Sequence, residues 1–232
     1  DDVLSVTWMN RIQNSSVLSE CREAGAAWTC VTILPRDQPG GWIEIAPPPL
    51  YTSDGAFLVI RPSEQADGLS YPHVALVPQG GGQVTFLTQG QFVVTELLKW
   101  KEESATVYFM GTDRDAPGAR HLYTVSTTGS SALQCVTCSL PTTRGPPCQR
   151  SSVLLSPSLE HYVHTCLGQG LPEAVLRRAD DHTIIFEFET NSELEEKLAG
   201  KALPKRVDTW VELDGGFRAP VKLLLPPHMD EN

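Results

Sequence analysis

Short stretches of alternating or continuous apolar residues, separated by turn-forming residues, recur through most of this 232-residue chain. The turns between paired stretches fall near Ser53-Asp54, Glu102-Glu103 and Pro157-Ser158, so the unit repeats about every 50 residues. Repeats of this length with about four strands each are typical of β-propeller blades, whereas a β-sandwich would not explain the recurrence. The sequence therefore predicts an all-β fold, a partial β-propeller. Strands are expected within 55–62, 73–78, 83–88, 92–100, 105–112, 120–127, 133–140, 151–158, 161–166, 173–178 and 183–190.

The pattern changes after the last of these strands. Ser192 in the N-cap position, Glu195 three residues later and Gly200 beyond the end predict a short helix. Two apolar stretches within 206–225, around an Asp-Gly-Gly turn, predict a β-hairpin. We therefore expect a domain boundary near residues 190–205.

The composition excludes some classes of function. The formal net charge is −10 and no basic stripe is present, which argues against a nucleic-acid-binding surface. The longest apolar runs are far too short to span a bilayer, and the first residues lack the features of a signal peptide. The chain starts at Asp1-Asp2 and stops at Glu231-Asn232, and we expect it to be a piece of a longer protein.

The cysteines occur in even number and in local clusters, which suits three short-range disulfides. A four-residue turn brings its end Cα atoms within about 7 Å, so even a Cys-x-x-Cys pair can close. The expected bridges are Cys21–Cys30, Cys135–Cys138 and Cys148–Cys166.

Zinc binding and free thiols are the alternatives for these cysteines. His161, His164 and Cys166 are near the Cys-x-x-Cys pair in sequence, which favours zinc. However, His161 and His164 would point to opposite faces of a strand, and a second Cys-x-x-Cys pair is missing. A thioredoxin-type redox pair lacks its surrounding βαβ pattern. We therefore prefer disulfides and assign no metal.

Asn14 begins the one N-glycosylation sequon of the chain, Asn14-Ser15-Ser16. A sequon alone is weak evidence, because such triplets arise often by chance. Combined with three expected disulfides, it indicates a secreted or cell-surface protein.

A resemblance to a known family is carried by residues 6–21, 52–55, 118–125, 135–140, 148–172, 191–198 and 225–230. On these residues the chain resembles the dipeptidyl peptidase IV family of prolyl oligopeptidase-like serine peptidases, which also includes fibroblast activation protein and inactive, channel-associated relatives. The resemblance covers nearly the whole chain, although one further family disulfide, around residues 75–86, has no cysteines here.

The resemblance implies a division of the chain into three parts. Residues 1–190 would form about four blades, the second half, of an eight-bladed propeller. Residues 191–205 would form a helical linker, and residues 206–232 the first hairpin of an α/β-hydrolase domain that this chain does not contain. The family pairs its cysteines in the way that the spacing suggests here.

The resemblance also implies an activity for the parent protein, the release of N-terminal X-Pro or X-Ala dipeptides by an extracellular serine aminopeptidase. The propeller would gate the active site and bind other proteins. Such a hydrolase needs a serine in a G-x-S-x-G motif, and no serine in this chain lies in one. We expect no catalytic residue and no cofactor in this piece. The alternative is a non-catalytic accessory ectodomain, an ion-channel modulator or an adhesion protein.

Two places on the chain are candidate functional surfaces. In the family, a Phe-Arg loop that follows a Gly-Trp pair reaches the substrate, but the segment after Gly41-Trp42 is shorter and has no Phe-Arg. The outer propeller surface near the sequon recruits proteins such as adenosine deaminase in the family. We expect Val31, Ile33, Leu34 and Trp42 to contribute to such a surface, and a strand with one buried face is the alternative for the first three.

The resemblance implies further properties of the parent. It would be a homodimer and the ectodomain of a single-pass type II membrane protein. Its propeller would contact the remaining blades and the hydrolase domain of the same chain.

We predict that Asn14 carries a glycan when the protein passes through a secretory pathway, because its sequon is intact. The mass of the secreted protein should fall on enzymatic deglycosylation. The same treatment should leave the mass of an Asn14→Gln variant unchanged. An unchanged mass in the unmutated protein would contradict the prediction.

Overall fold

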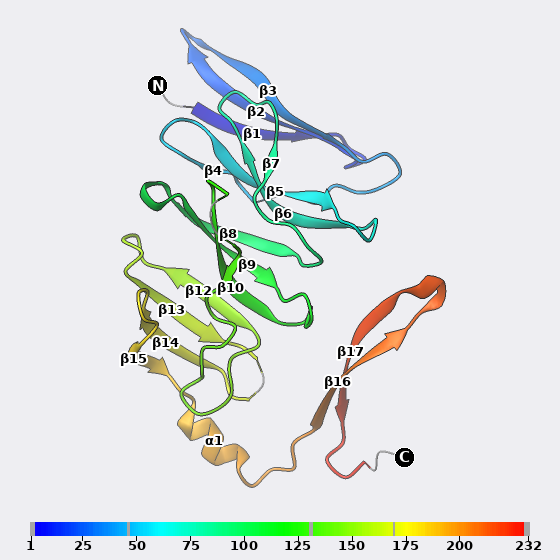
Figure 1. The fold of residues 1–232 in the computed structure, drawn as a ribbon, viewed down its shortest axis with the longest axis vertical. Helices are drawn as coiled ribbons and strands as arrows, with labels where there is room; N and C mark the ends of the chain where they lie inside the picture. Colours follow the sequence, from blue (N-terminus) through cyan, green and yellow to red (C-terminus); the bar gives the residue numbers. More distant parts are fainter. Residues whose placement is uncertain (1–2, 46, 130–131, 169, 230–232) are drawn as a thin grey trace. The chain divides into compact units, whose positions relative to one another are not determined.

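The computed structural model describes residues 3–45, 47–129, 132–168 and 170–229, and nearly all its regular structure is antiparallel β-sheet (Figure 1). By its contacts the chain divides into two units. The first comprises residues 1–109 and 125–133, and the second comprises residues 110–124 and 134–232.

Four sheets follow one another along the chain, and in each the strands pair in sequence order. The first has three strands and the other three have four each, which is the meander of propeller blades. The strands of the first two sheets are β1 (Val3–Met9), β2 (Ser15–Ala24), β3 (Ala27–Asp37), β4 (Leu50–Tyr51), β5 (Phe57–Glu64), β6 (Ser70–Val77) and β7 (Thr85–Phe86). Those of the next two are β8 (Val94–Lys101), β9 (Thr106–Thr112), β10 (Arg120–Ser126), β11 (Gln134–Cys135), β12 (Ser151–Leu155), β13 (His161–Cys166), β14 (Glu173–Arg178) and β15 (Ile184–Glu189).

The eleven strands expected between residues 55 and 190 are all present, with ends shifted by a few residues. The first sheet was not expected in this form. Its long β2–β3 hairpin turns at Gly25, whose φ of 70° is a left-handed value that glycine adopts without strain. Its strands mix polar and apolar residues, so they lack the apolar runs that mark the later strands.

The hydrophobic core of the first unit lies between its first two sheets. Phe57 and Val59 alternate on β5, and Ala75 and Val77 alternate on β6, so each pair presents its side chains to one face. Full burial of one such large side chain contributes about 1.5–3 kcal/mol to folding. These four residues form one buried cluster with Leu18 of β2 and Ile33 of β3, against which Leu34, Val84 and Phe86 pack.

The fourth sheet buries one face in the same way. On β13, Tyr162, His164 and Cys166 are buried, and the residues between them are half-exposed. On β14, Glu173, Val175 and Arg177 are buried in alternation. This face is therefore unusually polar for a blade core.

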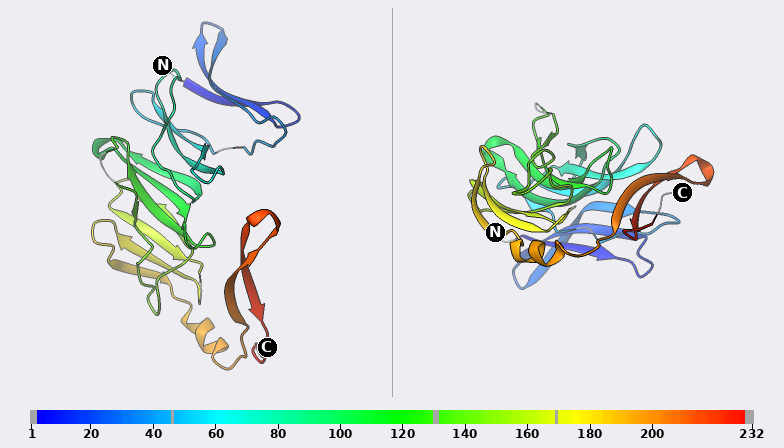
Figure 2. Two further views of the ribbon diagram at one scale, coloured as in Figure 1. Left: turned by 45° about the vertical axis from the view of Figure 1, so that its right-hand side comes forward. Right: turned by 90° about the horizontal axis from the view of Figure 1, so that it is seen from below.

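The predicted helix and hairpin follow the fourth sheet (Figure 2). The helix α1 (Ser192–Leu198) has Asn191 as its N-cap, not Ser192 as predicted. Asn191 adopts a left-handed conformation, and its carbonyl oxygen accepts a hydrogen bond from the Glu195 N–H at 3.0 Å. The hairpin is a two-stranded sheet of β16 (Lys205–Glu212) and β17 (Arg218–Leu225).

A turn glycine of the second sheet lies close to the first sheet. Gly81 has a φ of 89°, and a Cβ added to it would lie 2.7 Å from Ile33 Cγ2 and 2.8 Å from the Ile33 carbonyl oxygen. Gly80 also has a positive φ, 73°, but a Cβ there would meet nothing within 4 Å. Substitutions at Gly80 and Gly81 therefore distinguish the cost of backbone strain from the cost of the steric clash with Ile33.

We expect Gly80→Ala to lower the free energy of unfolding by about 1–2 kcal/mol, because it adds left-handed strain alone. Gly81→Ala should cost about 1–3 kcal/mol more, because its methyl group also forces the two sheets apart. Urea unfolding of both variants measures the difference. Equal destabilisation by the two substitutions would show that the approach to Ile33 does not limit this interface.

Candidate functional site

The three disulfides join the cysteines in the predicted pairs. Cys21 and Cys30 are direct partners in the β2–β3 register, so this bridge staples the long hairpin of the first sheet. The bridge between Cys148 and Cys166 ties the segment before β12 to the end of β13. No cysteine in the described part of the chain is free. This framework fixes local geometry around each candidate site.

The sequon lies at the turn that precedes β2. Asn14 is half-buried, and its side-chain oxygen accepts a hydrogen bond from Asn10 Nδ2 at 2.7 Å. Among the described residues its own Nδ2, the atom that would carry a glycan, makes no hydrogen bond. The conformation is therefore compatible with glycosylation.

The structure separates the four residues predicted to form a partner surface. Val31 is 62% exposed and Trp42 is 64% exposed, whereas Ile33 is only 7% exposed. Ile33 belongs to the core between the first two sheets, and half-buried Leu34 packs against that core. We therefore withdraw Ile33 and Leu34 from the candidate surface. The β2–β3 register shifts between Leu18 and Ser19 and leaves Ile33 without a partner, and this bulge lets two consecutive residues contact the core. Val31 and Trp42 remain candidates.

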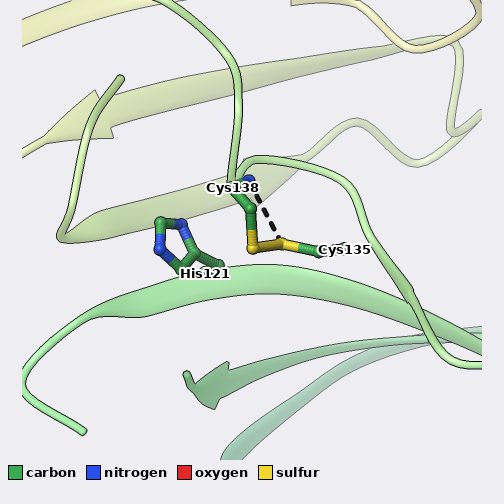
Figure 3. Close-up of side chains that lie close together, drawn as sticks. All are labelled: His121, Cys135 and Cys138. Atoms are coloured by element: carbon green, nitrogen blue, oxygen red, sulfur yellow. Dashed lines mark hydrogen bonds between the residues drawn. A yellow bond between two sulfur atoms is a disulfide. The ribbon is translucent and has the colours of Figure 1, made fainter. Parts of the chain in front are cut away.

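A histidine lies beside the Cys135–Cys138 bridge (Figure 3). The ligand atoms of His121, Cys135 and Cys138 lie within 4.8 Å of one another. The dashed line in Figure 3 is the hydrogen bond that the Cys138 N–H donates to Cys135 Sγ at 3.1 Å. A metal would bind the thiolates of these cysteines, but here the two sulfurs are joined to each other. The grouping therefore serves as a structural bridge.

The histidines of the zinc alternative lie on opposite faces of β13, as the alternation of a strand requires. His164 is buried, His161 is half-exposed, and Cys166 is bonded to Cys148. His121 lies 14 residues before Cys135, outside any short metal-ligand spacing, so the sequence did not predict its position beside the bridge. In the β10–β11 register Tyr123 pairs with Cys135, and this pairing brings His121 of β10 close to the bridge.

His164 and Ser151 form a serine–histidine pair with 2.8 Å between Oγ and Nε2. Each residue is 1% exposed, so no substrate can reach the hydroxyl group. Nδ1 of His164 has no hydrogen-bond partner, whereas a catalytic histidine is oriented at this atom by a carboxylate. The pair therefore has a structural role.

Arg177 lies on the same buried face of the fourth sheet. Its guanidinium donates to the His182 carbonyl oxygen at 2.9 Å and to the Pro141 carbonyl oxygen at 2.7 Å. Burial, with smaller effects from the charges of Arg177 and His121, lowers the pKa of His164 to about 4. This buried face therefore holds its histidine neutral at physiological pH.

Two carboxylates hold turns of the fold. Glu102, which lies at one of the predicted turns, accepts hydrogen bonds from the Ser53 N–H and from Ser53 Oγ at 2.7 Å. Glu173 accepts hydrogen bonds from the Thr143 N–H at 2.9 Å and from Thr143 Oγ1 at 2.6 Å. Neither contact was predicted, because it joins residues 30 or more positions apart.

The geometry of the sheets and bridges agrees with the comparison of the chain with known proteins. The family described as dipeptidyl peptidase IV, N-terminal region, matches residues 1–173. The chain belongs to the dipeptidyl peptidase IV family. Within the described residues, no helix is long and apolar enough to cross a membrane.

Curated relatives in the dipeptidyl peptidase IV family include active and inactive proteins. Inactive dipeptidyl peptidase 10 of Rattus norvegicus is 29% identical over 95% of this chain and 28% of its own length. Dipeptidyl peptidase 4 of Bos taurus is 26% identical over 100% of this chain and 30% of its own length. Venom dipeptidyl peptidase 4 of Apis mellifera is 30% identical over 100% of this chain and 29% of its own length. The chain thus spans less than a third of these relatives.

The fold agrees with that of a solved structure of the family. The crystal structure of Porphyromonas gingivalis dipeptidyl peptidase 4 matches with a TM-score of 0.76 and 19% identity, over 99% of this chain and 30% of that one. This similarity supports the partial propeller as the fold.

We expect His164 to make the protein sensitive to acid. In the unfolded chain its pKa is about 6.5, so below that pH the unfolded state binds a proton that the folded state takes up only near pH 4. Stability contributed by this residue is present above pH 6.5 and falls by about 3 kcal/mol as the pH drops to 4.

The measurement is the loss of stability between pH 7 and pH 4 in a His164→Gln variant, whose side chain does not titrate. That loss should be smaller than in the unmutated protein by about 3 kcal/mol. His161→Gln, on the other face of the same strand, is the matched control and should leave the acid sensitivity unchanged. An unchanged loss in His164→Gln would refute the assignment.

Proposed function

We propose that this chain is the propeller part of an extracellular serine aminopeptidase that releases X-Pro or X-Ala dipeptides. Residues 1–190 supply blades, residues 191–205 a linker and residues 206–232 the first hairpin of the hydrolase domain. The observation that carries the proposal is the family membership, with peptidase relatives aligned over the whole chain.

The role of these residues is to shape and gate access to an active site that lies elsewhere in the parent. No serine of this sequence lies in a G-x-S-x-G motif, and the buried Ser151–His164 pair is inaccessible. Catalysis requires an activated nucleophile that substrate can reach. The missing Phe-Arg in the segment after Trp42 gives this protein a different substrate entrance from that of the family.

The disulfides, the sequon at Asn14 and relatives named as venom proteins support an extracellular location. Anchoring of the parent by a single membrane-spanning segment and its assembly as a homodimer follow from the resemblance. Exposed Val31 and Trp42 would belong to a surface for a protein partner.

A second candidate function is that of a non-catalytic accessory ectodomain. Its support is specific: inactive dipeptidyl peptidase 10 is as similar to this chain as the peptidases are. The lost Phe-Arg pair points in the same direction.

The full-length protein should hydrolyse a Gly-Pro chromogenic substrate, and a serine-reactive inhibitor should abolish the turnover. Residues 1–232 alone should show none, because they lack the nucleophile. A folded full-length protein without turnover would reject the peptidase and support the accessory ectodomain.

A further inference from the structure

A small pocket opens in the first unit, beside the core that joins its first two sheets. Its volume is about 70 Å³. Strands β1, β2, β3 and β5 and the segment that follows β3 contribute its walls. Most of the wall is apolar, formed by Met9, Leu18, Leu34, Ile43, Ile45, Pro47, Pro49, Val59 and Ile60.

Two arginines from neighbouring sheets line this apolar pocket, Arg36 of β3 and Arg61 of β5. Both are half-buried. Among the described residues, neither guanidinium takes part in a hydrogen bond or an ion pair. Glu44, the one carboxylate among the lining residues, is exposed and forms no ion pair with either of them.

This arrangement is costly, because burial disfavours a charged group that has no counter-charge. Burial, and then the charge of Arg36, lowers the pKa of Arg61, which still remains protonated at physiological pH. Other arginines pair with carboxylates, namely Arg22, Arg144, Arg178, Arg206 and Arg218. Buried Arg177 donates to two carbonyl oxygens. Two positive charges that share an apolar pocket without a counter-charge are therefore exceptional within the described residues.

We propose that Arg36 and Arg61 bind a carboxylate borne by a small apolar group. The planar guanidinium presents paired N–H donors that match the two oxygens of a carboxylate. The adjacent apolar wall would cover a short aliphatic substituent, and a pocket of about 70 Å³ leaves room for little more. All lining residues of this site lie on this chain, so ligand binding can be measured independently of the proposed peptidase turnover.

Two sources supply this chemistry, the C-terminus of a peptide with an apolar last residue and a free short-chain fatty acid. Acetyl-glycyl-leucine represents the first source and hexanoate the second. The amide of the same peptide, acetyl-glycyl-leucinamide, keeps the apolar group and removes the charge.

Binding of each probe to the full-length protein is measured by calorimetry at low and at physiological salt. We expect the carboxylate probes to bind and the amide to bind at least about tenfold more weakly, because it lacks the charge that the arginines recognise. Added salt should weaken the carboxylate complexes. Binding of the peptide alone would assign the site to peptide C-termini, and equal binding of hexanoate would assign it to the carboxylate with any short apolar tail.

The variants Arg36→Gln and Arg61→Gln should each weaken binding of the carboxylate probe at least about tenfold. Exposed Arg11, outside the pocket, provides the matched control, and Arg11→Gln should bind as the unmutated protein does. Arg61→Lys keeps the charge and loses the paired donors, so it should bind more weakly than the unmutated protein even if Arg61→Gln fails to fold.

Three results would overturn the proposal. The first is the absence of binding by either carboxylate probe, and the second is equal binding of the amide. The third is equal or tighter binding of inorganic phosphate, which would show an unspecific anion site without a role for the apolar wall.

Discussion

An apolar face of a sheet in this protein is buried only where a neighbouring sheet packs against it. The rest of the structure depends on this constraint. Phe57 and Val77 of the second sheet pack against Leu18 and Ile33 of the first, and Gly81 permits their close approach. Where no neighbour is present, large apolar side chains are exposed. Trp8 on β1, Phe186 and Phe188 on β15, and Trp210 and Leu224 on the β16–β17 hairpin are examples.

Local bonds support this packing but cannot replace it. The disulfides close short loops within single sheets, and a bridge of this kind mainly restricts the unfolded chain. The polar face of the fourth sheet adds hydrogen bonds to buried groups, among them those of Ser151 and Arg177. These contacts satisfy only part of the buried polar groups, since, among the described residues, His164 Nδ1 and Arg177 Nε have no hydrogen-bond partner. The buried histidine makes that face sensitive to pH.

Sequence patterns predicted the features that depend on neighbours in the chain. The strands after Gly55, the helix near Ser192 and the hairpin follow from alternation and turn residues, which act over a few positions. The long β2–β3 hairpin did not follow, because its strands mix polar and apolar residues. The burial of Ile33 was only the alternative prediction, because the core that covers it is completed by residues distant in sequence. For the same reason, the sequence predicted neither the position of His121 beside Cys135 nor the pocket that Arg36 and Arg61 both line.

We propose that these blades need further parts of a parent chain to cover their exposed apolar faces. Hydrogen exchange of residues 1–232 alone, compared with the same residues in the full-length protein, tests this most directly. We expect amides of β1, β15 and the β16–β17 hairpin to lose protection in the isolated chain, and those of β5 and β6 to keep it. Equal protection of all these strands in both proteins would contradict the account.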